Sequence, residues 1–480
     1  MPCRLLRNAL LTRRPRAGLA GLVLALGTVG TVAAQSATPV ALAPGQMTAV
    51  RPCIVPVGDD RMAGVPDGLG ARLDGDRVVV LMNHGLSAAD GSLSGSRVSR
   101  LVLDPKTGAV LAGRSVVDGT EGHESFCSAF LADGRVGFGS PTFLTGEEST
   151  ASTWGGMAVA VDGDTGKATR LPWLGFLDHE NVLVVPGFAG KTVVLLTDDD
   201  SEGSELCQCV ADGPADLLAG KGQLSVFVAD GATGTADVAK GASLAGHFAP
   251  IDRKDNADAA ALQKAADAAG AFTFVRLEDL ASDRANPAAV SFADTGDSEA
   301  PNLSPNGTSL TKNGRIHTLT LVAADPAPAS GFGVLLDGDR GDAILNPDNP
   351  ETDGRQLLIR EGRNGHNRTE FEDTAPILSH DLASKSLTPV ARLDQSESNT
   401  LTDPGVKAGE WGSSGIIDAS NVLGPGAWLI DVQAHPLKVP QFGGGDEGGH
   451  LLLVRSKQPN PPRSGTAPAP SRSGAVLSPR

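Results

Sequence analysis

Clusters of acidic, cysteine and asparagine residues recur along this chain, each next to an apolar segment. The residues in these clusters that could bind a metal are Asn83, Cys127, Glu147, Glu180, Asp198, Asp199, Glu278 and Asp279. Oxygen donors drawn from many separate loops suit Ca²⁺ or ferric iron, and a cysteine among them favours a transition metal. Taken singly, such residues are more often solvated turn formers, so the prediction rests on the set.

Several common catalytic patterns do not occur in the sequence. It contains no HExxH, no paired CxxC, no Walker loop and no GxSxG, so zinc-protease, zinc-finger, nucleotide-binding and serine-hydrolase functions lack support. The 40 basic and 56 acidic residues give a formal net charge of −16. Such a charge repels nucleic acid and anionic lipid, so we expect neither as a partner. An anionic substrate would need a bound cation to receive it.

The first residues have the pattern of a cleaved export signal. Five arginines precede an apolar stretch over residues 17–32, which small residues follow; the stretch is short for a membrane span. We expect a signal peptide over residues 1–34, a periplasmic or secreted protein, and no membrane attachment after cleavage. Arg13-Arg14 suggests the twin-arginine route, although Pro15-Arg16 fits that motif poorly. Without this segment 35 basic and 56 acidic residues remain, a net charge of −21.

The elements that would position the clusters are short strands. Apolar segments such as 77–82, 192–196 and 427–432 are bounded by Gly, Asp, Asn or Pro, which is typical of strands between tight turns. Three segments end in Asp-x-x-Thr-Gly, at residues 104–108, 162–166 and 230–234. The aspartate can cap the turn and the glycine can take a positive φ, so each predicts a hairpin connection.

Many hairpins over some 400 residues need a closed arrangement that protects the strand edges. We therefore predict an all-β fold, a β-propeller of about six four-stranded blades over residues 51–456. A pair of β-sandwich domains is the alternative. The predicted helix, residues 257–269, is rich in alanine and indicates a surface insertion. Residues 457–480 are rich in Pro, Ser and Arg and are predicted to be a disordered tail.

Four cysteines remain once Cys3 leaves with the signal peptide, too few for a disulfide scaffold. Cys207 and Cys209 have one residue between them, which strains a mutual bridge. Cys53 could pair with Cys127, or Cys127 could bind a metal, and both alternatives stay open.

In their joint order these motifs resemble the PhoX-type alkaline phosphatase family and its relatives, over about residues 57–454. The segments that carry the resemblance are PDGLGARLDGDRVVVLMNHG, FCSAF, FLTGEES, LGFLDHENVLVVP, VVLLTDDD, FVRLEDLASDRANPAAVSF and SSGIIDASNVLGPGAWLIDVQAH. The resemblance implies a six-bladed propeller that holds a ferric iron pair with calcium ions. It also implies export by the twin-arginine route and hydrolysis of small phosphate esters.

The resemblance further implies metal ligands. Cys127 matches the family's iron-ligand cysteine, and Glu147 and Glu180 match acidic ligands. Asn83 lies in the first motif and is included as a candidate ligand.

The remaining matches lie in the middle of the chain. Asp198 or Asp199 matches a further acidic ligand, with the register open by one residue. Glu278 and Asp279 match an acidic pair that follows an arginine, here Arg276. That arginine is the candidate catalytic residue, because it could contact phosphate; alternatively it could pair with the carboxylates.

The sequence departs from the family at glycine positions. Gly85, Gly362 and Gly412 stand where relatives carry acidic residues, and Leu277 stands where proline is usual. Each glycine removes a donor and a negative charge. A two-metal site needs its charge balance to hold the cations close together, so these departures argue against a full iron complement more than against calcium.

Three functions fit the sequence. The first is an exported metal-dependent phosphoesterase that resembles alkaline phosphatases and uses in-line hydrolysis activated by metal. The second is a non-catalytic secreted propeller stabilised by calcium. The third is a calcium-dependent lactonase or esterase, because propellers host many reactions.

Overall fold

The computed structural model describes residues 40–42, 47–53, 56–57, 60–61, 64–87, 94–200, 203–297, 311–362, 375–393, 412–438 and 447–456. The chain divides into two units, Met1–Ser36 and Ala37–Arg480, and every described element belongs to the second. The predicted signal peptide and the predicted tail lie outside the described residues. Among the described residues, no helix is long and apolar enough to span a bilayer.

The second unit consists of antiparallel sheets, as predicted. One sheet contains β5 (Pro66–Asp74), β6 (Arg77–His84), β7 (Arg97–Leu103) and β8 (Val110–Asp118). The next contains β9 (Phe126–Ala132), β10 (Thr142–Glu147), β11 (Ala158–Asp162) and β12 (Ala168–Arg170). A nine-stranded sheet has the order β13 (His179–Val185), β14 (Thr192–Asp198), β15 (Leu206–Ala211), β16 (Gln223–Ala229), β17 (Leu244–Pro250), β21 (Asp325–Asp337), β20 (Arg315–Val322), β19 (Ala289–Asp294) and β18 (Leu277–Ser282).

The remaining sheets combine late strands with strands from the beginning of the unit. One has the order β1 (Val40–Leu42), β25 (Leu387–Leu393), β24 (Pro376–Asp381), β23 (Gln356–Glu361) and β22 (Pro347–Thr352). Another has the order β2 (Met47–Cys53), β28 (Glu447–Ser456), β27 (Ala427–Lys438) and β26 (Gly412–Asp418). A two-stranded ribbon pairs β3 (Pro56–Val57) with β4 (Asp60–Arg61).

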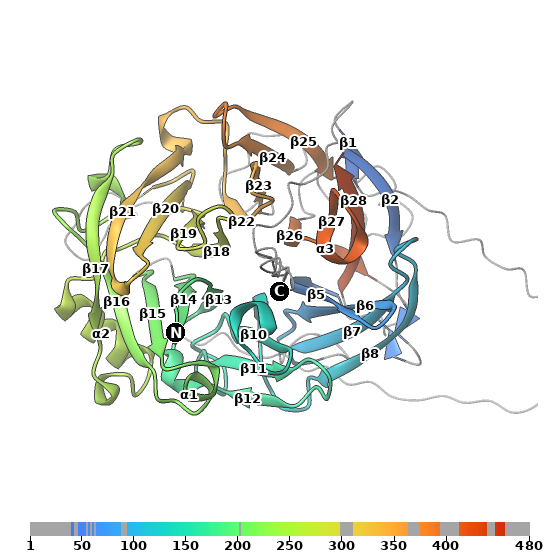
Figure 1. Cartoon of the computed structure of the whole chain (residues 1–480), viewed down its shortest axis with the longest axis horizontal. Coiled ribbons are helices and arrows are strands. Elements are labelled where there is room, and N and C mark those ends of the chain that lie inside the picture. The colour runs from blue at the N-terminus through green and yellow to red at the C-terminus, as the bar shows by residue number, and fades with distance from the viewer. Residues whose placement is uncertain are drawn as a thin grey trace, which may run out of the picture. The chain divides into compact units, whose positions relative to one another are not determined.

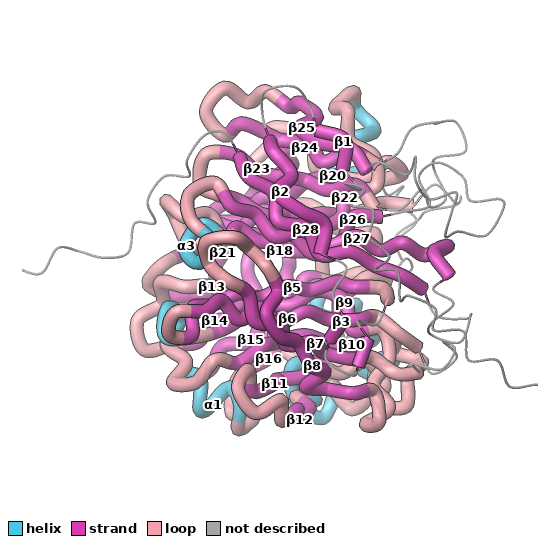
Figure 2. Tube along the Cα trace, turned by 90° about the vertical axis from the view of Figure 1, so that its right-hand side faces the viewer, coloured by secondary structure: helices cyan, strands magenta, loops and turns pink. Residues whose placement is uncertain are grey.

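The described helices are short and lie in connections between strands (Figure 2). They are α1 (Pro214–Leu218), α2 (Ala259–Ala269), α3 (Ser420–Leu423), and the 3₁₀ turns η1 (Gly134–Val136), η2 (Pro172–Leu174), η3 (Thr235–Asp237), η4 (Arg253–Asp255) and η5 (Gly338–Arg340). Helix α2 is the predicted one. It starts two residues later than expected because the Asp258 side chain caps it, accepting from the Ala261 amide at 2.8 Å.

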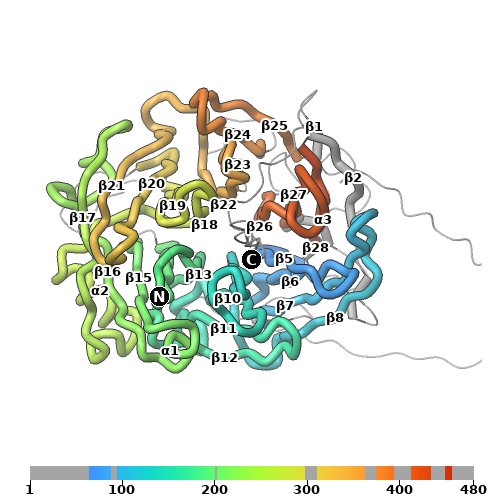
Figure 3. The backbone as a smooth tube through the Cα atoms, viewed as in Figure 1, coloured from blue at the N-terminus to red at the C-terminus, as the bar shows by residue number. Residues whose placement is uncertain are grey.

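The innermost strands form a closed ring within this unit. Among the described residues, β5 contacts β9, β9 contacts β13, β13 contacts β18, β18 contacts β22, β22 contacts β26, and β26 contacts β5. The chain runs once around the ring in sequence order, from blue β5 to red β28 (Figures 1 and 3). This is a β-propeller, as predicted. Dividing the nine-stranded sheet between β17 and β21 would give the expected six blades.

The ring is closed by strands from opposite ends of the described chain. Strand β2 pairs with β28 antiparallel, from Met47 opposite Ser456 to Cys53 opposite Leu451. Strand β1 pairs with β25 in the preceding sheet. Closure of this kind satisfies the backbone groups that the edge of β28 would otherwise expose.

Packing of sheets against one another explains the continuous apolar runs in the sequence. Each residue from Val78 to Met82 in β6, and from Val193 to Leu196 in β14, is almost fully buried. A strand covered on both faces reads as an unbroken hydrophobic run rather than an alternating one.

Two of the three predicted hairpin turns form. The side chains of Asp104 and Asp162 each accept hydrogen bonds from the amide and the hydroxyl of a threonine three residues later. Gly108 and Gly166 then take positive φ values of 69° and 78°, where a residue with a Cβ would be strained.

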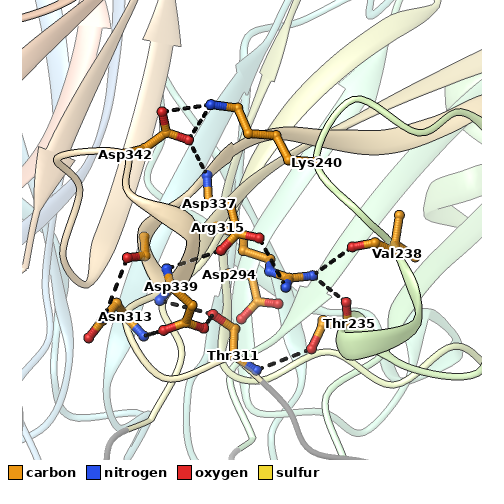
Figure 4. Close-up of polar contacts among 12 residues, drawn as sticks. Thr235, Val238, Lys240, Asp294, Thr311, Asn313, Arg315, Asp337, Asp339 and Asp342 are labelled. Atoms are coloured by element: carbon orange, nitrogen blue, oxygen red, sulfur yellow. Dashed lines mark hydrogen bonds and ion pairs between the residues drawn. The ribbon is translucent and has the colours of Figure 1, made fainter.

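The third predicted turn, at 230–234, does not close a tight hairpin. Strands β16 and β17 do pair, but their connection continues through η3 to residue 243. Buried Arg315 of β20 explains the detour (Figure 4). Its guanidinium donates to the carbonyls of Thr235 and Val238 and pairs with Asp337 at 3.1 Å. The connection is therefore fastened to β20 and β21 rather than folded back.

Candidate metal centre

Every inner strand carries a bulge near its first residue. In each bulge, two residues of the inner strand lie opposite a single residue of the neighbouring strand. The intervening pairs are Asp67-Gly68, Cys127-Ser128, Glu180-Asn181, Glu278-Asp279, Asp348-Asn349 and Ser414-Gly415. Bulges re-aim side chains and are frequent next to functional sites. Because the inner strands surround the middle of the ring (Figure 1), the same local irregularity brings these residues together.

The first residues of these pairs supply potential metal ligands. Ligand atoms of Cys127, Glu148 and Glu180 all lie within 4.8 Å of one another, and so do those of Glu180, Glu278 and Asp348. Glu180 belongs to both groups, so the two form one continuous set. We call these five residues the acidic cluster.

Glu148 reaches the acidic cluster from the end of β10 rather than from an inner strand. Its amide donates to the Ser125 carbonyl at 2.8 Å, and it forms an isolated bridge with Asp178. These two backbone contacts attach the segment after β10 to the residues just before β9 and β13. The Glu148 side chain therefore lies beside Cys127.

Arg276 lies at the more exposed side of the acidic cluster. Its Nη2 is 2.8 Å from Asp199 Oδ2 and 3.4 Å from Glu278 Oε1. About a third of its side chain is exposed, whereas Asp199 is buried. The backbone of Arg276 has a φ of 57°, a strained value for a residue with a Cβ. The charge of Asp199 raises the pKa of the guanidinium further, so this side chain is a fixed cation.

The second residues of the bulge pairs form a hydrogen-bonded layer that supports the cluster. Asn349 donates to Ser128 Oγ at 2.7 Å and to Asp279 Oδ2 at 2.6 Å. Asn181 donates to the other oxygen of Asp279, and Ser128 Oγ donates to Glu180 Oε1 at 2.9 Å. These contacts join four inner strands and hold Glu180 in position.

The electrostatics of the acidic cluster show a surplus of negative charge. Burial, followed by repulsion from neighbouring carboxylates, raises the pKa of Glu148, Glu180 and Glu278 well above the usual range. Burial also raises the pKa of Asp348 to about 7, against the opposing charge of Arg360. Burial and the charges of Asp67 and Glu180 raise the pKa of the Cys127 thiol. A bound cation would relieve this repulsion.

The donor set fits a metal ion. Carboxylate oxygens suit calcium, and one thiolate among them suits iron or zinc. Glu180 Oε2 and Asp199 Oδ1 are buried and have no hydrogen-bond partner among the described residues. Unsatisfied buried carboxylate oxygens are costly unless something pairs with them, and both belong to residues in or beside the cluster. The structure therefore contains acidic groups that could hold metal.

Several predicted ligands meet here. Cys127, Glu180 and Glu278 belong to the acidic cluster, and Asp199 contacts Arg276 beside it. The Cys127 thiol is free and donates to Asp67 Oδ2 at 3.3 Å. Cys207 and Cys209 are also free thiols, and the Cys53 side chain lies outside the described residues.

Other predicted residues have contacts away from the cluster. Glu147 is fully buried beside His123, with Nδ1 and Oε1 3.3 Å apart, and it accepts from the Glu124 and Met157 amides. Asp198 accepts from the Asp178 amide at 3.0 Å, and its pKa is raised by burial and by the charge of Glu205.

Asn83 and Asp279 support the acidic cluster through hydrogen bonds and do not belong to it. Asn83 Nδ2 donates to the Cys127 carbonyl at 2.7 Å and to Thr145 Oγ1 at 2.6 Å, so it holds the strand that carries the thiol. Asp279 belongs to the supporting layer, and burial raises its pKa to about 6.

The candidate ligands chosen from the sequence did not include Glu148, Asp348 or Asp67, although Asp67 and Glu148 lie in motifs that the sequence analysis identified. Glu148 follows Glu147 directly, and only the register of β10 decides which of the two faces Cys127. Asp67 and Asp348 each follow a proline at the start of a strand, as Pro66-Asp67 and Pro347-Asp348. Each is the second residue of its strand, the position that Cys127, Glu180 and Glu278 hold in theirs.

Gly362 lies beside a residue of the acidic cluster, and Gly85 lies beside Phe126, which precedes Cys127. A Cβ on Gly362 would lie 3.3 Å from Asp348 Oδ2, and one on Gly85 would lie 3.1 Å from the Phe126 carbonyl. Gly412 begins β26 and is buried. An acidic side chain at Gly362 would therefore have added to the charge around Asp348.

Comparisons with known proteins show the fold. No family model matches this chain, and no match is found among curated proteins. PhoX from Pseudomonas fluorescens, solved in complex with vanadate, a transition-state analogue, has a TM-score of 0.61 and 14% identity, covering 88% of this chain and 97% of its own. The periplasmic gluconolactonase PpgL from Pseudomonas aeruginosa has a TM-score of 0.35 and 12% identity, covering 82% and 86%. At such identities the likeness to the first structure shows a shared propeller fold.

Proposed function

We propose that this protein is an exported, metal-dependent phosphoesterase that hydrolyses small phosphate esters. The observation that carries the proposal is the convergence of one thiol and four carboxylates, with Arg276 beside them, from separate strands. The fold is shared with a protein that binds vanadate, a transition-state analogue. Export rests on the pattern of residues 1–34.

We further propose that the acidic cluster holds calcium, and that a softer metal such as iron binds at its Cys127 side. Cys127, Glu148 and Glu180 would form one ligand set, and Glu180, Glu278 and Asp348 another. When bound, such cations act as Lewis acids toward a phosphoryl group.

The side chains of the chain itself would bind and orient the ester. Arg276 has the planar donor geometry that suits phosphate oxygens. Asp199 and Glu278 hold its guanidinium at the exposed side of the cluster. In this position it would contact the phosphoryl oxygens and offset negative charge that develops on them.

A non-catalytic propeller stabilised by calcium is the second candidate. The specific observation in its favour is Gly362, which leaves the space beside Asp348 without a further carboxylate. Such a protein would bind calcium and melt at a lower temperature in chelator, yet turn over no ester.

The proposal is tested with natively exported protein and an aryl phosphate. We expect turnover that calcium supports and a chelator abolishes. Arg276→Gln should lower kcat/KM about 100-fold, because a donor to the developing charge is lost. Arg135→Gln, on an exposed side chain that bonds Asp133, is the matched control and should keep full turnover.

Absence of turnover by folded, metal-replete protein would overturn the phosphoesterase and favour the non-catalytic propeller. Hydrolysis of a lactone but not of a phosphate ester would instead favour a calcium-dependent lactonase.

A further inference from the structure

One sector of the ring, the sheet that contains β26, β27 and β28, differs from the others in its charged groups. The bulge pair of β26 is Ser414-Gly415, so this bulge contributes no carboxylate. A Cβ on Gly415 would lie 2.8 Å from Asp431 Oδ2 and 2.7 Å from the Asp67 carbonyl. The carboxylate of Asp431, from the adjacent strand β27, therefore lies where a side chain at Gly415 would begin.

Asp431 is an unusual group in this sector. It is fully buried, and no side chain among the described residues donates a hydrogen bond to its oxygens, which lie beside the backbone of Gly415. Burial and the charge of Asp67 raise the pKa of Asp431, whereas the charge of Arg360 lowers it. A buried carboxylate of this kind needs a cation nearby to remain ionised.

Arg360 of β23 is that cation. Its side chain is fully buried, its Nη2 donates to Asn349 Oδ1, and the same nitrogen lies 3.5 Å from Asp348 Oδ2. Its Nε and Nη1 have no hydrogen-bond partner within the described part of the chain. The guanidinium charge also lowers the pKa values of Asp67 and Asp348 against the effect of their burial.

A buried arginine remains charged at neutral pH, because guanidinium is a far weaker acid than the ammonium group of lysine. Unlike a metal ion, it cannot be removed by a chelator. Asp348, Asp431 and Asp67 belong to three successive sheets of the ring. The guanidinium of Arg360 lies 3.5 Å from Asp348, and its charge also acts on Asp431 and Asp67. Arg276, by contrast, faces Asp199 and Glu278 on the exposed side.

We propose that Arg360 is a built-in cation that takes the place of one divalent ion between Asp348, Asp67 and Asp431. Metal is then confined to the acidic cluster, where Asp348 lies at the border between the metal ligands Glu180 and Glu278 and the guanidinium of Arg360. The inference rests on the metal centre of the proposed function, but it does not depend on turnover.

The test counts metal ions in the full, exported chain. Wild type, Arg360→Gln, Arg360→Lys, Asp431→Asn and the double variant Arg360→Gln/Asp431→Asn are stripped with chelator and reloaded with Ca²⁺ at pH 8. Bound calcium is measured by elemental analysis, and melting temperatures are measured in chelator and in calcium. Phosphoesterase turnover is recorded separately, so a catalytically inactive protein still gives a result.

We expect Arg360→Gln to bind one calcium ion per chain more than wild type and to gain more in melting temperature from calcium. Arg360→Lys keeps the charge and should keep the wild-type count. The double variant removes the surplus carboxylate and should return to that count. A folded Arg360→Gln with unchanged calcium content and unchanged sensitivity to chelator would overturn the proposal.

If Arg360→Gln does not fold, the double variant Arg360→Gln/Asp431→Asn tests the proposal instead. Charge balance predicts that the double variant folds, because the unpaired anion is gone. If it also fails to fold, Arg360 is needed for its shape or its hydrogen bond to Asn349, and the proposal is wrong.

Discussion

At the residue scale, adjacent carboxylates in this protein have different tasks. Glu147 packs against His123 and two backbone amides, whereas Glu148 lies beside Cys127 and Glu180. The same contrast separates Asp198 from Asp199, because only the latter contacts Arg276. Residue type alone therefore says little about which member of such a pair binds a ligand.

The two glutamates provide a matched pair of variants. Glu148→Gln should weaken calcium binding about 10-fold or more, because a ligand and its charge are lost. Glu147→Gln should leave calcium affinity unchanged but lower the free energy of unfolding by about 1–3 kcal/mol, because buried hydrogen bonds weaken. Calorimetric calcium titration and urea unfolding in chelator measure the two effects. A larger loss of affinity in Glu147→Gln would contradict the site described here.

Cys127 is the residue that should distinguish the binding of iron or zinc from the binding of calcium. Its thiol has a raised pKa in the metal-free protein, so the thiolate should form only when a cation binds. Cys127→Ser should lose iron or zinc and keep its calcium, since serine keeps an oxygen but not a soft sulfur donor. Elemental analysis of exported protein measures both. Cys209→Ser, in the buried strand β15, is the control, and equal iron loss in that variant would argue against a role for Cys127.

At the element scale, helix α2 is attached to the propeller through a buried acid. Gln263 of α2 donates to Glu205 Oε1 at 2.6 Å. Burial raises the pKa of Glu205 to about 8, with the charges of Asp267 and Asp200 adding to the shift and the Gln263 hydrogen bond opposing it. The helix therefore covers a carboxyl group that is neutral at neutral pH.

This shift predicts how stability depends on pH. Between about pH 4.5 and 8 the folded protein keeps a proton on Glu205 that the unfolded chain releases. The contribution is complete below pH 4.5 and is lost as pH rises to 8, at up to about 1.4 kcal/mol per pH unit. Glu205→Gln should therefore flatten the decline in melting temperature between pH 5 and 8 in chelator. Asp252→Asn, on an exposed side chain, should keep the wild-type slope; an unchanged slope in Glu205→Gln would refute the assignment.

At the scale of the whole molecule, stability depends on closing the ring. Strand β2 provides the outer strand for the sheet of β26, β27 and β28. Without it, β28 would expose a full row of backbone donors and acceptors, which is a template for aggregation.

A truncation tests this closure. Mature protein that begins at residue 56 lacks β1 and β2, and we expect a large fall in melting temperature together with concentration-dependent aggregation. Removal of residues 457–480, which the composition predicts to be disordered, is the control and should change neither. A truncated protein that melts like the full mature chain would show that the pairing of β2 with β28 contributes little.

Sequence alone determined the class of structure and the positions of most strands. The length of an apolar segment and the turn residues that bound it are local properties of the sequence. Segments such as 77–82 and 192–196 are therefore strands where expected, and Asp104 and Asp162 cap the expected turns. Helix α2 was recognisable for the same reason. Strands β16 and β17 pair, but the prediction of a tight turn at 230–234 was wrong, because Arg315, some 80 residues later, binds the carbonyls of Thr235 and Val238 in a longer connection.

Tertiary structure decided which polar residues form the candidate site. Cys127, Glu180 and Glu278 were recognisable, but Glu148, Asp348 and Arg360 acquire their roles only when distant strands meet. A bulge shifts the side-chain direction by one residue, and a one-residue shift exchanges an inward carboxylate for an outward one. Burial and mutual repulsion, which set the charge of the cluster, likewise depend on neighbours that are far away in the chain.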